Sequence, residues 1–256
     1  MKKAVEMTTS ILSLHAGYDS GDSFVDGYVA RPADSNTHPG LVVISGMGGL
    51  NWFQREITRT FAREGFVAVS PDLYDGVLPE GHATQLRYKN SLDIDRAIAN
   101  ICAGSNFLHS LPWVGDKSSI GVIGFCLGGG LALLALARSN VFGAGVIYYH
   151  SLFPDSAELN SIEAPMMCHY GTNDHTTPIE EIDAFRASLD NYNKYYEVFM
   201  YEGVGHSFLN PKQDTSPLRA DAAELSLQRT AAFFHEHLAQ SKGIEEIESG
   251  ELKSDK

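Results

Sequence analysis

The sequence predicts an α/β fold, with a mostly parallel sheet covered by helices on both faces. Short apolar runs typical of buried strands alternate along the chain with helical segments, which is the pattern of strand–helix–strand units. One apolar run, Ile120–Phe125, leads through a glycine-rich turn into the helical stretch Gly130–Ala137. Two later apolar runs each end in a polar loop that carries an aspartate or a histidine. In a parallel sheet these loops meet at one edge, where ligands bind.

The expected strands are short apolar segments, and the expected helices lie between them. Two strands open the chain at Ser10–Leu14 and Ser23–Ala30, separated by a turn rich in glycine and aspartate. Further strands are expected at 41–45, 66–69, 120–125, 144–149, 166–170 and 195–201. Helices are expected at 52–64, 83–103, 130–137, 179–189 and 218–240, and a long loop is expected over 151–164.

The turn Gly124-Phe125-Cys126-Leu127-Gly128 matches the nucleophile-elbow pattern G-x-S-x-G, with cysteine in place of serine. A strand that turns sharply into a helix exposes the middle residue of the turn. Glycines on both sides let the two elements approach closely. A cysteine in an isolated pattern of this kind could equally be a small buried apolar residue.

Asp174 and His206 complete a catalytic pattern with Cys126. Asp174 follows the strand expected at 166–170, and His206 follows the strand expected at 195–201. The chain order of nucleophile, acid and histidine is that of α/β-hydrolases, so this fold is expected. Taken alone, Asp174 could instead cap the helix expected at 179–189.

These residue types fit acyl transfer. A thiolate attacks an acyl carbon, and His206 could take the proton of Cys126 while Asp174 orients the imidazole. The predicted helix N-terminus also favours the thiolate. We expect the backbone N–H groups of Leu127 and Met47 to form the oxyanion hole.

Composition narrows the class of protein. The 256 residues fit one α/β domain over residues 1–240, followed by a polar tail at 241–256 that is rich in glutamate and expected to be disordered. The net charge of −13 and the isoelectric point near 5.1 argue against binding to nucleic acid. No run approaches 18 apolar residues, so no membrane span is expected.

The chain start and the cysteines bear on location and cofactors. Met1–Glu6 has two lysines but no apolar segment of a secretory signal follows them. The three cysteines, Cys102, Cys126 and Cys168, give no disulfide framework and suit a cytoplasmic protein. No metal-ligand spacing is visible, and we expect no metal and no cofactor. A monomer or small homo-oligomer is expected.

At the level of motifs, the chain resembles the dienelactone hydrolase family, also called carboxymethylenebutenolidases, from about Leu41 to about Phe234. The elbow carries this resemblance together with Ser70–Tyr74, Asn173–Pro178 and Gly205–Phe208. The resemblance implies a cysteine–histidine–aspartate hydrolase of cyclic or activated esters, acting on a small-molecule ester or lactone.

Two departures from the family pattern concern activation and recognition. The best-known members carry a Gln-Glu pair whose glutamate holds the resting thiol, and here the matching pair is Ser45-Gly46. They also carry a substrate-binding arginine at the place of Asn210. A second substrate arginine could match Arg87, which could equally be a solvated helix charge. Tyr149 belongs to a further segment similar to the family, and we include it among the candidate substrate-binding residues.

The leading interpretation is a hydrolase of lactones or activated carboxylic esters that forms an acyl-enzyme on Cys126. A broad carboxylesterase or thioesterase of the same fold is the first alternative. The second is a non-catalytic binding protein that keeps the fold. A binding module has no need of all three residues Cys126, Asp174 and His206, which favours the enzyme.

Overall fold

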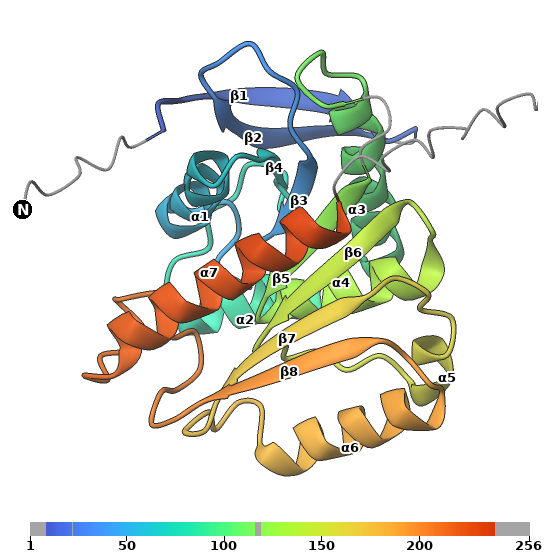
Figure 1. Cartoon of the computed structure of the whole chain (residues 1–256). Coiled ribbons are helices and arrows are strands. Elements are labelled where there is room, and N and C mark those ends of the chain that lie inside the picture. Colours follow the sequence, from blue (N-terminus) through green and yellow to red (C-terminus); the bar gives the residue numbers. More distant parts are fainter. Residues whose placement is uncertain (1–8, 22, 116–118, 239–256) are drawn as a thin grey trace, which may run out of the picture.

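A single twisted sheet forms the centre of the molecule (Figure 1). The computed structural model describes residues 9–21, 23–115 and 119–238. In this part of the chain the sheet has eight strands in the order β1-β2-β4-β3-β5-β6-β7-β8. The strands are β1 (Ile11–Asp19), β2 (Phe24–Pro32), β3 (Gly40–Ile44), β4 (Val67–Pro71), β5 (Ile120–Phe125), β6 (Phe142–Tyr148), β7 (Met166–Gly171) and β8 (Tyr196–Tyr201).

The first two strands run against the others. β1 pairs antiparallel with β2, and β2 pairs antiparallel with β4, whereas the pairs from β4 through β3, β5, β6 and β7 to β8 are parallel. Every residue of β3 and β5 is buried, which explains their unbroken apolar sequences. The mostly parallel sheet and its helical layers confirm the predicted α/β-hydrolase fold.

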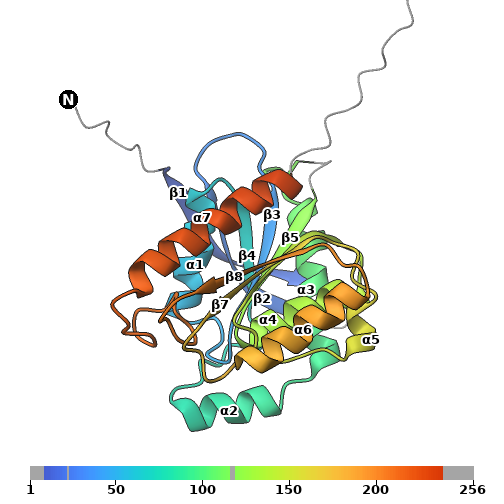
Figure 2. The ribbon, with the colours of Figure 1, turned by 60° about the horizontal axis from the view of Figure 1, so that its bottom comes forward.

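Helices cover both faces of the sheet. α1 and α7 pack on one face, and α3 and α4 pack on the other, as the two views show (Figures 1 and 2). The helices are α1 (Trp52–Arg63), α2 (His82–Asn90), α3 (Ile94–His109), α4 (Leu127–Arg138), α5 (Ser156–Leu159), α6 (Ile179–Asn191) and α7 (Arg219–His237). None of those described has the length and apolar character needed to cross a bilayer.

One helix predicted from the sequence is divided into two helices in the structure. The helix predicted over 83–103 is interrupted, with α2 ending at Asn90 and α3 beginning at Ile94. Asp93 adopts an extended backbone, and its carboxylate accepts a hydrogen bond from the N–H of Arg96, at 3.0 Å. This side-chain cap starts a new helix. Figure 2 shows α2 at the lower edge of the molecule, and none of its residues is buried.

Two smaller differences follow from local contacts. β1 extends to Asp19 because it pairs with β2 as far as Asp19 and Phe24, so the turn is shorter than expected. The buried Tyr18 near this end donates a hydrogen bond to the carbonyl of Asn100. The loop predicted over 151–164 contains the short helix α5, whose capping box joins Asp155 and Glu158. The tail at 241–256 lies outside the described residues, and the single domain over 1–240 stays a prediction.

Candidate active site

The sharp turn between β5 and α4 holds Cys126 at φ 57° and ψ −116°. A positive φ is uncommon for a residue with a side chain, and such strain costs on the order of 1–3 kcal/mol. The close approach around it requires glycine. A Cβ at Gly124 would lie 1.9 Å from the carbonyl oxygen of Gly128, and a Cβ at Gly128 would lie 2.5 Å from the carbonyl oxygens of Ile44 and Ser45. The geometry is that of the predicted elbow.

The elbow gives a stability prediction. Gly128→Ala is expected to lower the free energy of unfolding by about 1–3 kcal/mol, because the added methyl group meets backbone atoms that cannot rotate away. Gly205→Ala is the matched control, since a Cβ there has its nearest neighbour at 3.5 Å, an ordinary contact. Thermal and urea unfolding of both variants measure the effect. Equal stability of the two variants would contradict the crowded turn.

Asp174 and His206 lie side by side after β7 and β8. The Nδ1 atom of His206 donates a hydrogen bond to Oδ2 of Asp174, at 2.8 Å. The other oxygen, Oδ1, accepts from the backbone N–H groups of Thr176 and Thr177, at 2.7 and 3.0 Å. The Asp174 side chain is fully buried, whereas the His206 side chain is one-fifth exposed. The carboxylate is therefore fixed at both oxygens and orients the imidazole.

The Cys126 thiol and the His206 imidazole perturb each other. Burial would raise the pKa of the thiol, but the nearby imidazole of His206 outweighs it, with help from Ser151 and the N–H of Leu127, and holds the pKa below its ordinary value. Nε2 of His206 makes no hydrogen bond to any described residue, so in this structure the imidazole acts on the thiol through its charge. Burial would lower the pKa of His206, but Asp174 and Cys126 together raise it to about 9. Opposite shifts of this kind favour a thiolate beside an imidazolium.

Ser151 is the other polar contact of the sulfur. Its Oγ lies 3.5 Å from Sγ of Cys126. The backbone N–H of Ser151 donates to the carbonyl oxygen of Cys126, at 3.1 Å, so this serine is held against the elbow by two contacts. A hydroxyl here can donate to a thiolate.

Cys126 and His206 open into a cavity of about 320 Å³ at the carboxyl ends of the strands. It is lined by Gly46, Met47, Gly48, Gly49, Asn51, Phe53, Gln54, His82, Gln85, Phe125, Cys126, Tyr149, Thr176, His206, Ser207, Asn210 and Gln213. The volume suits a small molecule.

The candidate substrate-binding residues divide into two groups. Tyr149 and Asn210 line the cavity, as does Met47. Tyr149 has φ 35°, its ring lies 5.0 Å from that of His206, and its buried hydroxyl has no hydrogen-bond partner among the described residues. Arg87 is exposed and does not line the cavity, and its guanidinium lies 5.8 Å from the ring of Tyr88.

A family model supplies the decisive comparison. The model of the dienelactone hydrolase family matches residues 25–238, which is most of the chain. The chain belongs to the dienelactone hydrolase family. As a member it is an enzyme that hydrolyses lactones or esters, and the alternative of a non-catalytic binding protein is not supported.

Individual relatives agree with this assignment. The carboxymethylenebutenolidase of Rhodococcus opacus is 31% identical over 230 residues, which cover 82% of this chain and 86% of that protein. The carboxymethylenebutenolidase of Pseudomonas putida is 28% identical, over 89% of this chain and 96% of its own. A dienelactone hydrolase-like promiscuous phosphotriesterase from metagenomic libraries superposes with a TM-score of 0.77 at 22% identity, covering 89% of this chain and 98% of that one, and shows the shared fold.

This member of the dienelactone hydrolase family has no carboxylate where the family glutamate is expected. A Cβ at Gly46 would lie 3.3 Å from Cβ of Cys126 and 4.0 Å from Sγ, so a side chain at this position would point at the thiol. It would also lie 3.3 Å from the carbonyl oxygen of Phe125, which is a tight contact. Activation of the thiol is therefore left to the groups that do contact it.

Three residues near the site are not predicted from the sequence, because none of them belongs to a recognisable motif. Ser151 follows β6 in a segment that the sequence marks only as a loop. His82 and Gln85 line the cavity from α2, and the single helix expected there gave no reason to select them over Arg87. The break before α3 and the tertiary contacts of α2 decide which of its residues face the cavity.

Proposed function

We propose that the enzyme opens lactones and activated carboxylic esters through an acyl-enzyme on Cys126, with His206 as acid and base and Asp174 as its orienting partner. The thiolate attacks the carbonyl carbon, and the charge moves to the carbonyl oxygen. Backbone N–H groups of Leu127 and Met47 stabilise this oxyanion. As the C–O bond breaks, His206 gives its proton to the leaving oxygen, and a thioester to Cys126 remains.

Hydrolysis of the thioester completes the cycle. His206, now neutral, accepts a proton from a water molecule as the oxygen of that water attacks the thioester carbon. The tetrahedral intermediate collapses, the Cys126 thiolate leaves, and the carboxylic acid product departs. With a lactone, the leaving oxygen stays attached to the acyl chain, so the ring opens. The observation that carries this proposal is the convergence of the elbow cysteine and the hydrogen-bonded Asp174–His206 pair on one cavity.

The test is to trap the acyl-enzyme and identify the residue that carries the acyl group. The enzyme is mixed rapidly with excess p-nitrophenyl ester, dienelactone or small thioester, quenched in acid and analysed by mass spectrometry of the intact protein and its peptides. We expect one acyl group, on the peptide that contains Cys126, and an unchanged result with the Cys102→Ala control. Turnover with the acyl group on another residue would overturn the proposal. The three substrate types also rank lactonase, carboxylesterase and thioesterase activity.

The resting state gives a pH prediction. Because the folded pKa of Cys126 lies below that of a free thiol, which is about 8.5, the thiolate should persist as the pH falls below that value. Iodoacetamide should therefore alkylate Cys126 rapidly at neutral pH without substrate, with the rate falling only at lower pH. The same thiolate should be sensitive to peroxide. A rate that follows the titration of free cysteine, or a midpoint above it, would contradict the ion pair.

A further inference from the structure

The cavity beside Cys126 carries few charges. Among the residues that the structure describes, its lining contains no lysine, arginine, aspartate or glutamate. The Cys126 thiol and the His206 imidazole are the lining groups whose pKa shifts favour a charge, and they face each other, with Asp174 bonded to the imidazole. Lys212 lies nearby, but its ammonium sits 4.4 Å above the ring of Trp52 and does not line the cavity. A substrate carboxylate would find no lysine or arginine among the described residues of this lining, whose basic side chains are the imidazoles of His206 and His82.

The polar lining of this cavity consists largely of side-chain amides instead of charged groups. The cavity is lined by Asn51, Gln54, Gln85, Asn210 and Gln213. The first two are committed to the fold. Asn51 caps α1 by accepting from two backbone N–H groups, and the Nε2 of Gln54 donates to the carbonyl of Val43 and the hydroxyl of Ser70. Oδ1 of the buried Asn210 also accepts, from the backbone N–H of Lys212 at 3.0 Å. Among the described lining residues, the amides with an oxygen free to meet a ligand are therefore those of Gln85 and Gln213.

Gln85 is the one of these that lies over the loop after β3. A Cβ at Gly48 would lie 3.6 Å from Nε2 of Gln85, so the amide stands beside the loop that contains Met47. Nε2 donates to the carbonyl of Pro79, at 3.3 Å, while the amide oxygen has no partner among the described residues. The side chain is half-buried and lines the cavity, with the amide held through Nε2.

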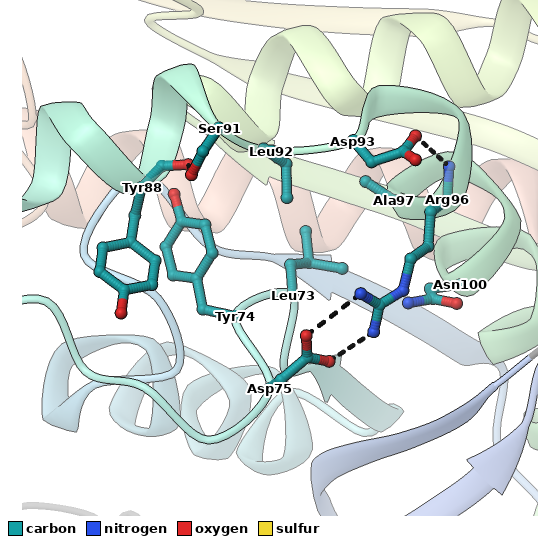
Figure 3. Close-up of a pocket in the computed structure, with 10 residues that line it drawn as sticks. All are labelled: Leu73, Tyr74, Asp75, Tyr88, Ser91, Leu92, Asp93, Arg96, Ala97 and Asn100. Carbon is teal, nitrogen blue, oxygen red and sulfur yellow. Dashed lines mark hydrogen bonds and ion pairs between the residues drawn. The ribbon is translucent and has the colours of Figure 1, made fainter.

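The position of α2 rests on a cluster at its far end (Figure 3). The ring of Tyr88 on α2 packs edge-on against Tyr74, with 5.4 Å between ring centres. Beside these rings, Arg96 of α3 donates to Asp75, at 3.1 Å, and joins the loop after β4 to the start of α3. These contacts surround a second, smaller cavity of about 180 Å³. Because α2 buries none of its own residues, this cluster and the Pro79 contact hold Gln85 in place.

We propose that Gln85 is a specificity-determining residue, which presents an uncharged amide to the part of the substrate beyond the reacting carbonyl. The enzyme then takes uncharged esters and lactones and discriminates against those that carry a carboxylate. This inference rests on the proposed function, since it concerns the same cavity and the same acyl transfer.

The test changes the charge at residue 85 and measures, in two assays, how strongly the enzyme prefers neutral over anionic reagents. Gln85→Arg and Gln85→Glu are compared with wild type for kcat/KM on p-nitrophenyl valerate and mono-p-nitrophenyl glutarate, which differ mainly in a carboxylate. In parallel, the rates of Cys126 alkylation by iodoacetate and iodoacetamide are compared without turnover. Lys89→Glu, one turn further along α2 and outside the cavity, is the matched control. Arg87→Gln tests the competing arginine.

Wild type should prefer the neutral ester. Gln85→Arg should raise the anionic-to-neutral ratio by about fivefold or more in both assays, and Gln85→Glu should lower it, as expected for a charge within several ångströms of the ligand. Lys89→Glu should change the ratio less than twofold. An unchanged ratio in the Gln85 variants, or a large change in Arg87→Gln, would overturn the inference. If no ester is turned over, the proposed function fails, while the alkylation ratio still decides the role of Gln85.

Discussion

Cys126→Ala is expected to remove turnover of every ester and lactone that the wild-type enzyme hydrolyses, with a loss of kcat on the order of 10⁴- to 10⁶-fold. The variant has no atom that can form the acyl-enzyme, and the neighbouring groups cannot replace it. The oxyanion donors and the cavity remain, so residual catalysis over water and binding of substrate should both survive.

The fold should tolerate this change. Alanine meets the same backbone requirement at φ 57° as cysteine does, and the one side-chain hydrogen bond of the half-buried sulfur among the described residues, to Oγ of Ser151, is a long one at 3.5 Å. Circular dichroism and thermal melting check that the variant is folded, and kcat is measured by release of p-nitrophenol. The matched variant Cys102→Ala, which removes a half-buried cysteine elsewhere, should keep wild-type activity. Near-wild-type turnover by Cys126→Ala would show that another residue is the nucleophile.

The elbow could be read from the sequence because it depends on local chemistry. Only glycine fits at 124 and 128, where the strand and helix nearly touch, and this requirement leaves a pattern in the chain. Asp174 and His206 could be placed because parallel strands bring their carboxyl ends to one edge. The Asp174–His206 contact in the structure has the expected partners.

Other parts depend on contacts that leave no local pattern. The segment around Ser91–Asp93 contains no glycine or proline that would predict the end of a helix. The helix is interrupted there because the side chain of Asp93 caps the start of α3. In the resulting α2, which is held by the Tyr74–Tyr88 contact, Gln85 lines the cavity and Arg87 does not. Ser151 reaches the thiol only because β6 lies next to β5. Such residues are found from tertiary structure and not from spacing.

Asp174→Asn is expected to reduce kcat/KM by about 10⁴-fold, because it sets the wrong tautomer of His206. The backbone N–H groups of Thr176 and Thr177 both donate to Oδ1, so the amide oxygen of the asparagine must take that place. Its NH₂ group then faces Nδ1 of His206. Nδ1 becomes the acceptor, the proton moves to Nε2, and the ring can no longer accept a proton from Cys126 or from water.

The same substitution should change the thiol. Hydrogen bonding and charge from Asp174 are part of what raises the pKa of His206, so their loss should lower that pKa and weaken the imidazolium. The thiolate loses its partner, and the pH profile of iodoacetamide alkylation should move toward that of free cysteine. A stopped-flow titration of alkylation from pH 5 to 10 measures this shift alongside kcat/KM.

Asp214→Asn separates this tautomer effect from disturbance of the loop. Asp214 is also buried, and its Oδ2 accepts from the N–H of Gly205, next to His206, but it makes no contact with the imidazole. Asp214→Asn should cost stability and some activity while leaving the alkylation profile near that of wild type. His206→Ala should match the loss seen in Asp174→Asn or exceed it. If Asp174→Asn kept its turnover, or if Asp214→Asn shifted the thiol profile equally, Asp174 would not be the residue that orients His206.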